Sequence, residues 1–263
     1  MGKERLTRLS LERDEVHLWF ADPAEIHDAA LLRAYEALLS AEELERMRQF
    51  RFPEHRHVHL VSHALRRVAL SRYAEVAPGD WRFTTNLYGR PEIAAPSGVP
   101  PLRFNLSHSD DLVVFGVALD QDIGVDVENA AWGAPPRDFA RRFFAEREYQ
   151  DWLAVAPELR HERFFDYWTL KEAYLKARGQ GLQLPSTHFA FQLEADGGVD
   201  IAFEEWLDDD ARDWSFWQFR PGADQHAALA VNGRRSVQHR AVCWRGVPLL
   251  DERLFSCEAT YST

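Results

Sequence analysis

Apolar positions in the N-terminal part of the chain follow two different spacings. Apolar and polar residues alternate over residues 16–22, which predicts a β-strand. Over residues 28–50 and 54–76, apolar residues recur at the spacing of one helix face, which predicts helices. Ser40 is followed three residues later by Glu43, the pattern of a capping box, so a second helix is expected to begin at Ser40.

Strand patterns dominate the middle of the chain. Residues 81–93 predict a strand that enters a turn at Gly89, and residues 102–128 predict two or three short strands. A segment with Gly and Pro, residues 129–138, then separates the two halves. The first half is therefore expected to contain a strand, helices and further strands.

Helices come first in the second half. Residues 138–155 and 162–180 have helical spacing, and Gly179 or Gly181 is expected to end the longer helix. Three strand-like pieces follow, at 188–194, 199–205 and 214–232. Because both halves mix helices with mainly antiparallel strand signals, the sequence predicts an α+β fold. The predicted parts are an N-terminal half, a C-terminal half and a tail, at residues 1–128, 129–235 and 236–263.

Composition and charge narrow the class of protein. The chain has 263 residues, 46% of them apolar, and a net charge of −11, which disfavours binding to nucleic acid or anionic membranes. No apolar run approaches the roughly 18 residues of a membrane span, and the first 16 residues lack a signal-peptide pattern. The two cysteines, Cys243 and Cys257, fit no zinc motif or disulfide framework. We therefore expect a reduced, cytoplasmic protein.

Positive charge is nevertheless concentrated between residues 46 and 72. This segment contains Arg46, Arg48, Arg51, Arg56, Arg66, Arg67 and Arg72, with His55, His57, His59 and His63. Such a segment could bind one anion locally. The alternative is that these are charges on helix surfaces, which we expect for Arg66 and Arg72.

Two carboxylates, Asp126 and Glu128, end an apolar strand pattern. Residues i and i+2 of a strand point to the same side, so these two acids repel each other unless water or a cation compensates them. Carboxylate oxygens of this kind suit Mg²⁺. A solvated strand end is the alternative, because an Asp-x-Glu pattern alone has low specificity.

Glu172 and Lys176 lie four residues apart on the longer predicted helix and therefore share a face. A surface ion pair is the simple interpretation. The surrounding residues Phe164, Phe165, Trp168, Tyr174 and Leu175 are apolar, which places this pair near buried surface. A third carboxylate and a lysine would suit a complex of Mg²⁺ and pyrophosphate.

Two further motifs could contact an anion. Ser107 and His108 are adjacent and point to opposite faces of a strand, so they do not suit a Ser–His catalytic pair. Both could donate to phosphate oxygens, or they could simply begin a polar turn. Gly89 permits a turn, and Arg90 could contact an anion or stack on a base.

These motifs occur in one order: YGRP at 88–91, FNLSHS at 104–109, IGVDVE at 123–128 and WTLKEAYLKARGQGL at 168–182. Together they resemble the 4′-phosphopantetheinyl transferases, specifically the large monomeric type that activates surfactin synthetase. The resemblance covers residues 40–205. It implies two similar α+β halves with an active site in the cleft between them.

The resemblance also implies the reaction. The 4′-phosphopantetheine arm of coenzyme A moves to a serine hydroxyl of an apo acyl or peptidyl carrier protein, with Mg²⁺ as the cofactor, and 3′,5′-ADP leaves. By resemblance, Asp126, Glu128 and Glu172 are the metal ligands. Glu172 or Glu148 is the general base, and Lys176 contacts the phosphates of coenzyme A.

The remaining contacts to coenzyme A follow from the same resemblance. Its phosphates and adenine are matched with Arg46, Arg51, Arg56, Tyr88, Gly89, Arg90, Pro91, Ser107, His108 and Lys171, in addition to Lys176. Many relatives have lysine at the position of Arg90, and some have a basic residue at the position of Glu43. A second hypothesis concerns the carrier protein, which we expect to dock beside Arg141 and Arg142.

Two other functions are weighed against this one. The first is a degenerate transferase that binds coenzyme A or a carrier protein without turnover, and the second is a Mg²⁺-dependent hydrolase of the coenzyme A pyrophosphate. The sequence leaves open which carrier protein is used, whether coenzyme A or acyl-coenzyme A is preferred, and what the tail does.

Overall fold

The structure is a computed structural model that describes residues 8–133, 136–233 and 239–263. The description leaves out residues 1–7, which belong to the segment without a signal-peptide pattern, and residues 134–135 of the Gly/Pro segment. It also leaves out residues 234–238, which contain the predicted boundary at 235–236. The helices are α1 (Ala29–Glu36), α2 (Ala41–Gln49), α3 (Pro53–Leu70), α4 (Arg137–Phe143), α5 (Glu146–Ala154) and α6 (Arg160–Arg178). The first strands are β1 (Glu15–Ala21), β2 (Arg82–Thr85), β3 (Pro91–Ala95), β4 (Leu102–His108), β5 (Val113–Leu119) and β6 (Asp122–Asn129). The later strands are β7 (Phe189–Leu193), β8 (Val199–Phe203), β9 (Trp214–Phe219), β10 (Gln225–Asn232), β11 (Arg240–Arg245), β12 (Arg253–Leu254) and β13 (Ala259–Ser262).

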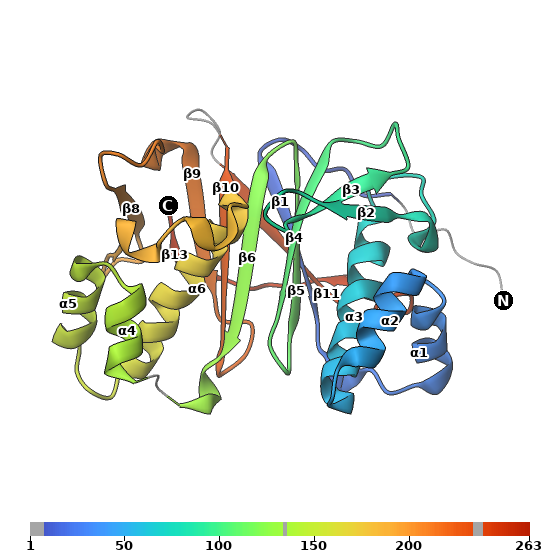
Figure 1. The fold of residues 1–263 in the computed structure, drawn as a ribbon, viewed down its shortest axis with the longest axis horizontal. Coiled ribbons are helices and arrows are strands. Elements are labelled where there is room, and N and C mark those ends of the chain that lie inside the picture. The colour runs from blue at the N-terminus through green and yellow to red at the C-terminus, as the bar shows by residue number, and fades with distance from the viewer. Residues whose placement is uncertain (1–7, 134–135, 234–238) are drawn as a thin grey trace.

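Two sheets form the centre of the molecule (Figure 1). One has the strand order β12-β11-β1-β5-β4 and the other the order β13-β9-β10-β6, and β2–β3 and β7–β8 are separate hairpins. Strand pairs are antiparallel except for β1 and β11. The predicted α+β fold is therefore confirmed.

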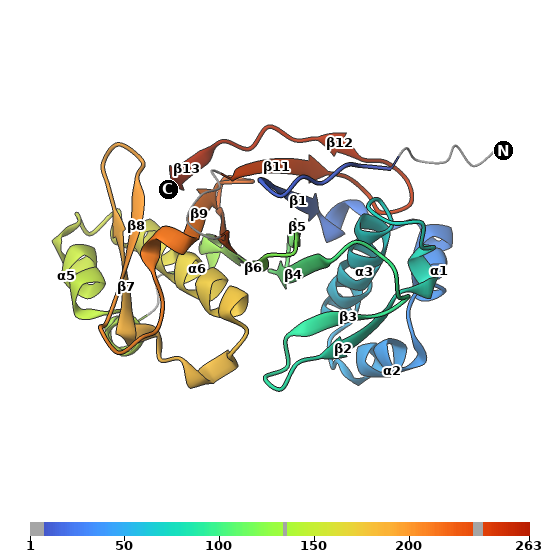
Figure 2. The same ribbon diagram turned by 90° about the horizontal axis from the view of Figure 1, so that it is seen from above.

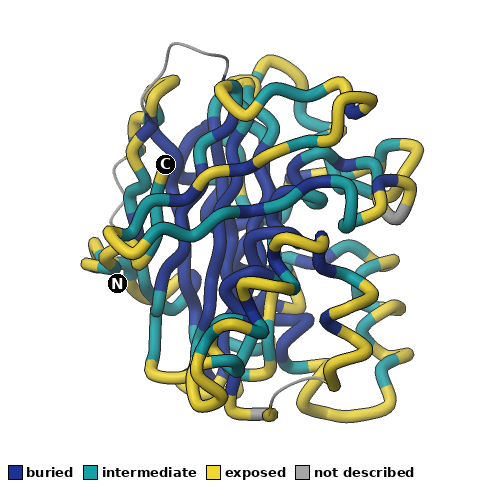
Figure 3. The backbone as a smooth tube through the Cα atoms, turned by 90° about the vertical axis from the view of Figure 1, so that its left-hand side faces the viewer, coloured by how far each residue is buried: buried dark blue, intermediate teal, exposed yellow. Residues whose placement is uncertain are grey.

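Three clusters of buried apolar residues hold this arrangement together, and the strands at the centre are buried along most of their length (Figure 3). Helix α3 packs on the first sheet, and α6 packs on the second. The third cluster lies between the sheets and takes residues from both, such as Leu18 of β1, Val125 of β6 and Leu229 of β10. A single shared core therefore joins the two sheets.

Several helix boundaries follow from local chemistry. Ser40 and Glu43 form the predicted capping box at the start of α2. Helix α6 ends at Gly179, which adopts the left-handed conformation with φ of 61°, as expected for a C-terminal cap. Residues 138–155, where the sequence predicts helix, form two helices instead of one, because Phe144 and Ala145 are extended.

The strand pairing adds two features to the predicted division of the chain. Strand β6 ends the predicted N-terminal half, yet its hydrogen-bonded partner is β10 in the second sheet. Residues of the predicted tail pair with both sheets, because β11 lies beside β1 and β13 lies beside β9. The division at residues 128 and 235 stays a prediction. Within the described residues, none of the helices combines the length and the apolar character needed to cross a bilayer.

Candidate functional site

Strand β6 has two faces with different tasks. Ile123, Val125 and Val127 point into the core between the sheets, so Gly124, Asp126 and Glu128 point to the other side, toward α6. A Cβ atom on Gly124 would lie 2.0 Å from the carbonyl oxygen of Ala173, so only glycine lets α6 approach so closely. The alternation of β6 therefore places two carboxylates against α6.

The ammonium group of Lys176 is the cation nearest to these carboxylates. Its Nζ donates to Asp126 Oδ1 at 2.6 Å and to Ser107 Oγ at 2.9 Å, and Ser107 Oγ donates to the same carboxylate oxygen at 3.1 Å. Asp126 is only 4% exposed, and its Oδ2 is buried without a hydrogen-bond partner. Three residues from β4, β6 and α6 thus meet at one carboxylate.

Glu128 and Glu172 complete the acidic group. Glu128 Oε1 accepts a hydrogen bond from Trp168 Nε1 at 3.0 Å. Burial raises the pKa of Glu128, and the charge of Asp126 raises it further. The pKa of Glu172 is raised by the same two causes in the same order, and Lys176 opposes the rise. All three carboxylates therefore lie within electrostatic reach of one another.

The chemistry of this group fits a divalent cation. Its donors are hard carboxylate oxygens, and the buried Oδ2 of Asp126 has no partner. Burial first, and the charge of Asp126 second, raise the pKa values of Glu128 and Glu172, and a bound cation would oppose both effects. In the described part of the chain, no three His, Cys, Asp or Glu side chains are arranged as a metal-binding group. The ammonium of Lys176 supplies the positive charge in this arrangement.

A cleft of about 290 Å³ opens beside these residues. It is lined by Tyr88, Gly89, Arg90, Pro91, Asn105, Leu106, Glu172, Leu175, Lys176, Gly179 and Gly181. The hairpin β2–β3 and the C-terminal end of α6 face each other across it (Figure 2). The structure therefore brings the YGRP motif together with Glu172 and Lys176.

His108 extends the polar region at the end of β4. Burial lowers its pKa, and the positive charges of Lys176 and His55 lower it further, while Asp110 opposes the change. His55 lies in the first turn of α3. His108 is therefore close enough to interact with both α6 and the basic segment.

The three arginines predicted to contact coenzyme A lie near the junction of α2 and α3. Arg46, Arg51 and Arg56 are exposed, and none of them lines the cleft of Tyr88 and Lys176. Arg56 Nε donates to the carbonyl oxygen of Phe50 at 2.8 Å, and Arg51 lies over the ring of Phe52. Their predicted contact with a ligand stays a prediction.

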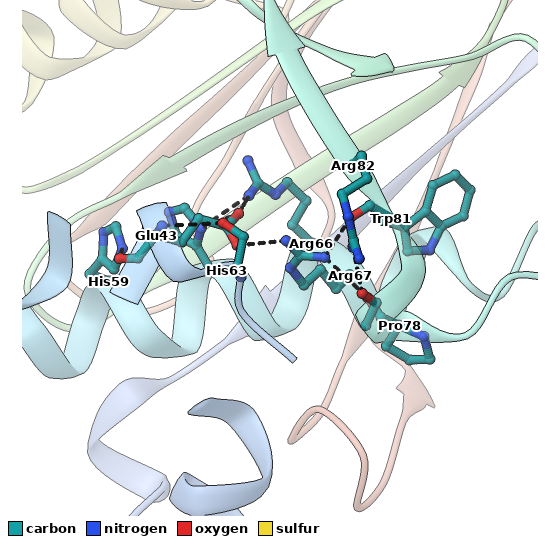
Figure 4. A network of polar contacts seen from close by, with 10 residues as sticks. Glu43, His59, His63, Arg66, Arg67, Pro78, Trp81 and Arg82 are labelled. Atoms are coloured by element: carbon teal, nitrogen blue, oxygen red, sulfur yellow. Dashed lines mark hydrogen bonds and ion pairs between the residues drawn. The ribbon is translucent and has the colours of Figure 1, made fainter. Parts of the chain in front are cut away.

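The most buried part of the basic segment forms a network around Glu43 (Figure 4). Arg66, Arg67 and His63 all contact its carboxylate. These contacts, with the backbone amide of Ser40, keep the pKa of Glu43 low although burial acts to raise it. Arg66 and Arg72, expected on a helix surface, are in fact buried, and Arg72 pairs with Glu252. Glu43 therefore anchors arginines internally.

Glu148 and Lys171 form a buried ion pair. Lys171 Nζ donates to Glu148 Oε2 at 2.6 Å, and the backbone amides of Ala145 and Phe191 donate to the two oxygens of Glu148 at 2.8 Å. Their side chains are 1% and 0% exposed. Neither side chain is among the residues that line the cleft of Tyr88 and Lys176. Their burial favours a structural role for the pair, and the roles predicted for Glu148 as a base and for Lys171 as a coenzyme A contact stay predictions.

Gly124 and Trp168 contribute to the site although no sequence motif predicts a role for them. A glycine two residues before an acid on an apolar strand could have indicated a close approach of another element. Trp168 lies four residues before Glu172 on the same helix, so a position on the face of Glu172 was predictable. Its contact with Glu128 on β6 was not, because this contact depends on how α6 and β6 pack.

Comparisons with known proteins show which family the chain resembles. Residues 122–231 match the profile of the 4′-phosphopantetheinyl transferase superfamily, and residues 27–119 match that of the N-terminal region of a 4′-phosphopantetheinyl transferase. The chain is 38% identical over 174 residues to the 4′-phosphopantetheinyl transferase HetI of Nostoc sp., which covers 66% of this chain and 73% of that protein. It is 35% identical over 168 residues to the 4′-phosphopantetheinyl transferase Sfp of Bacillus subtilis, which covers 64% and 72%.

A third relative aligns over more of the chain. The phosphopantetheinyl transferase of Thraustochytrium sp. is 31% identical over 251 residues, and the alignment covers 86% of this chain and 83% of that protein. Both family profiles and all three relatives carry the same activity in their names. The chain therefore belongs to the 4′-phosphopantetheinyl transferase superfamily.

Proposed function

We propose that this protein transfers the 4′-phosphopantetheine arm of coenzyme A to a serine hydroxyl of an apo acyl or peptidyl carrier protein. The serine oxygen forms a bond to the β-phosphorus of coenzyme A, the bond from that phosphorus to the bridging oxygen breaks, and 3′,5′-ADP leaves. The observation that carries the proposal is the meeting of Asp126, Ser107 and Lys176 beside Glu128 and Glu172.

Three carboxylates are proposed to hold Mg²⁺: Asp126, Glu128 and Glu172. When bound, the ion would neutralise charge on the pyrophosphate oxygens. Asp126 is suited to the task because its Oδ2 has no hydrogen-bond partner. The indole of Trp168 donates only to Oε1 of Glu128, so it does not occupy Oε2. The hydrogen bond from Trp168 fixes the orientation of that carboxylate.

The remaining side chains are proposed to bind phosphates and to move a proton. Lys176 Nζ uses two of its three N–H donors on Ser107 and Asp126, so the third can donate to a pyrophosphate oxygen. Ser107 Oγ can donate to such an oxygen when it releases Asp126 Oδ1. His108 is proposed to contact a phosphate, and Tyr88, Gly89 and Pro91 to line the adenine site. With Glu148 buried, Glu172 is the proposed general base, because it lines the cleft and its raised pKa strengthens it as a proton acceptor.

The protein is further proposed to act as a cytoplasmic monomer. The hairpin β2–β3, strand β4 of the first sheet and helix α6 of one chain line the cleft, so a second chain is not required to complete it. Sedimentation velocity in the presence of coenzyme A should give the mass of a single chain. A stable dimer would contradict this part of the proposal.

Mass spectrometry tests the transfer directly. The protein is incubated with coenzyme A, Mg²⁺ and a panel of apo carrier proteins, and a covalent adduct of phosphopantetheine mass on a serine is expected. A degenerate binding module would give no adduct, and a hydrolase would release free phosphopantetheine without any carrier. The panel also identifies the carrier protein.

Asp126→Asn tests the assignment of the site. The variant should lose transfer by at least about a hundredfold, because a ligand and the partner of Lys176 both change, and calorimetry should detect weaker Mg²⁺ binding. Asp200→Asn on the exposed face of β8 is the matched control and should keep the wild-type rate. Transfer by Asp126→Asn at the wild-type rate, with circular dichroism unchanged, would reject the metal assignment.

A further inference from the structure

Arg90 lies at the cleft, but protein acceptors already use its guanidinium group. Nη1 donates to Asp122 Oδ1 at 2.9 Å and to the carbonyl oxygen of Ala177 at 2.9 Å, and Nη2 lies 3.4 Å from Glu92 Oε1. The side chain is 14% exposed. Three of the five N–H donors of Arg90 are therefore directed to protein acceptors rather than to the cleft.

The turn that carries Arg90 is internally braced. Asn86 Oδ1 accepts hydrogen bonds from the backbone amides of Tyr88 and Arg90, both at 2.9 Å, and Gly89 adopts a φ of 89° that favours glycine. The backbone amide of Asn86 donates to the carbonyl oxygen of Arg90 at 2.9 Å. The turn is therefore held in shape by its own hydrogen bonds.

This turn is docked on the C-terminal end of α6. Ala177 has one of the last four carbonyl groups of the helix, which lack partners within the helix. Arg90 donates to it, and Asn86 Nδ2 donates to the carbonyl oxygen of Gly179 at 3.0 Å. A guanidinium group here also complements the negative end of the helix dipole. A Cβ atom at Gly179 would lie 2.8 Å from Arg90 Cδ, so the arginine packs directly over the helix cap.

Asp122 connects the same arginine to the catalytic strand. It is the first residue of β6, the strand that carries Asp126. Its Oδ1 accepts from Arg90 at 2.9 Å and from Arg103 Nη2 at 3.0 Å. Arg90 and Asp122 therefore join the strand β6 to two elements that line the cleft, the hairpin β2–β3 and the end of α6.

We propose that Arg90 and Asp122 are positioning residues that hold the hairpin β2–β3 against α6 and so set the width of the cleft. The inference rests on the proposed function, because it assumes that coenzyme A occupies this cleft. It assigns to Arg90 a role other than the ligand contact suggested by the family resemblance. Arg90 then acts on the ligand through Tyr88, Gly89 and Pro91, which its contacts hold in place.

The test compares two ligands that differ by one phosphate. Calorimetry gives the Kd of coenzyme A and of its analogue without the 3′-phosphate, for the wild type, Arg90→Ala, Asp122→Ala and the double variant. Arg90→Ala should raise both Kd values by the same factor, about tenfold, because it removes charge-assisted hydrogen bonds that shape the whole cleft. Asp122→Ala should raise both by several-fold, and the double variant should be no worse than Arg90→Ala.

A matched control and a second readout separate positioning from simple destabilisation. Arg82→Ala removes an exposed arginine of the same hairpin, which donates to the carbonyl oxygens of Gly79 and Trp81 and lies outside the cleft lining, so both Kd values should stay within about twofold of wild type. For Arg90→Ala, KM should rise while kcat stays within about twofold at saturation. Partial unfolding would instead lower kcat and leave KM unchanged.

Two outcomes would overturn the inference. If Arg90→Ala weakens coenzyme A but not the analogue without the 3′-phosphate, Arg90 contacts that phosphate directly. If Asp122→Ala leaves both Kd values at the wild-type level, the pair does not position the hairpin. Failure of the proposed function is separate, because the wild type would then bind coenzyme A without modifying any carrier protein, and the Kd comparison would still decide the role of Arg90.

Discussion

The ion pair of Lys171 and Glu148 allows a direct test of a structural role against a catalytic one. The pair is buried, and the two side chains are joined by a hydrogen bond of 2.6 Å. Lys171 Nζ also donates to the carbonyl oxygen of Phe189 at 2.9 Å and lies 4.3 Å from the centre of its ring. Lys171→Met keeps most of the side-chain volume and removes only the charge and its donors.

The cost of this change follows from what remains buried. Burial raises the pKa of Glu148, and the charge of Lys171 is the largest effect that opposes the rise. Without Lys171, the carboxyl group must take up a proton or stay charged without a partner. Breaking a fully buried pair in this way costs about 3–5 kcal/mol, a large part of the roughly 5–15 kcal/mol by which a typical domain is stable.

Urea unfolding followed by circular dichroism measures this loss, and the transfer rate is measured at a temperature where the variant stays folded. The double variant Lys171→Met with Glu148→Gln should lose less than the sum of the two single variants, because no charge is then left unpaired. Arg212→Met removes an exposed pair with Asp210 and should change stability by less than about 1 kcal/mol. The reasoning is refuted if Lys171→Met unfolds like the wild type but loses transfer.

Three more predictions concern the site and the Glu43 network. Gly124→Ala should separate β6 from α6, because the added Cβ would lie 2.0 Å from the carbonyl oxygen of Ala173. Both the melting temperature and kcat should therefore fall, and unchanged values for both would contradict this prediction. Burial lowers the pKa of His63 from 6.5 to about 4, so on acidification the unfolded chain takes up a proton at this residue before the folded protein does. The free energy of unfolding should therefore fall by about 2 kcal/mol between pH 6.5 and 5. His63→Asn should reduce this dependence on pH, and an unchanged dependence would contradict the argument. The pKa values of Glu128 and Glu172 are raised in the folded protein, so metal-free protein loses stability as pH rises above about 4.5. Saturating Mg²⁺ should therefore raise the melting temperature more at pH 8 than at pH 5. Equal shifts at the two pH values would contradict the proposed metal site.

Local sequence patterns were sufficient for most elements of the fold. The capping box of Ser40 and Glu43, the alternation along β1 and the glycine that ends α6 each act through neighbouring residues, so they can be read from the chain. The pairing of β11 with β1 could not be predicted, because about 220 residues separate them and register is set by the core that both strands cover. Strand β12 has only two residues, too few to show any alternation.

The buried position of Lys171 has a geometric cause. Lys171 and Glu172 are adjacent in the sequence, but an α-helix turns by about 100° per residue, so their side chains point in different directions. Glu172 and Lys176 are four residues apart and share a face, which lines the cleft. Lys171 instead points into the core near Phe189. A family motif therefore contains both site residues and core residues, and only helix geometry separates them.

The carboxylates of the site depend on the core for their direction. Strand β6 alternates between Ile123, Val125 and Val127, which fill the core between the sheets, and the side that carries Asp126 and Glu128. A shift of register by one residue would bury both acids in that core and would expose the apolar side chains to α6. Such a shift is strongly opposed, because an unpaired charge in an apolar core is very costly. The packing that stabilises the two sheets therefore also fixes where Asp126 and Glu128 point, and this explains why an apolar strand ends in two acids that face the same helix.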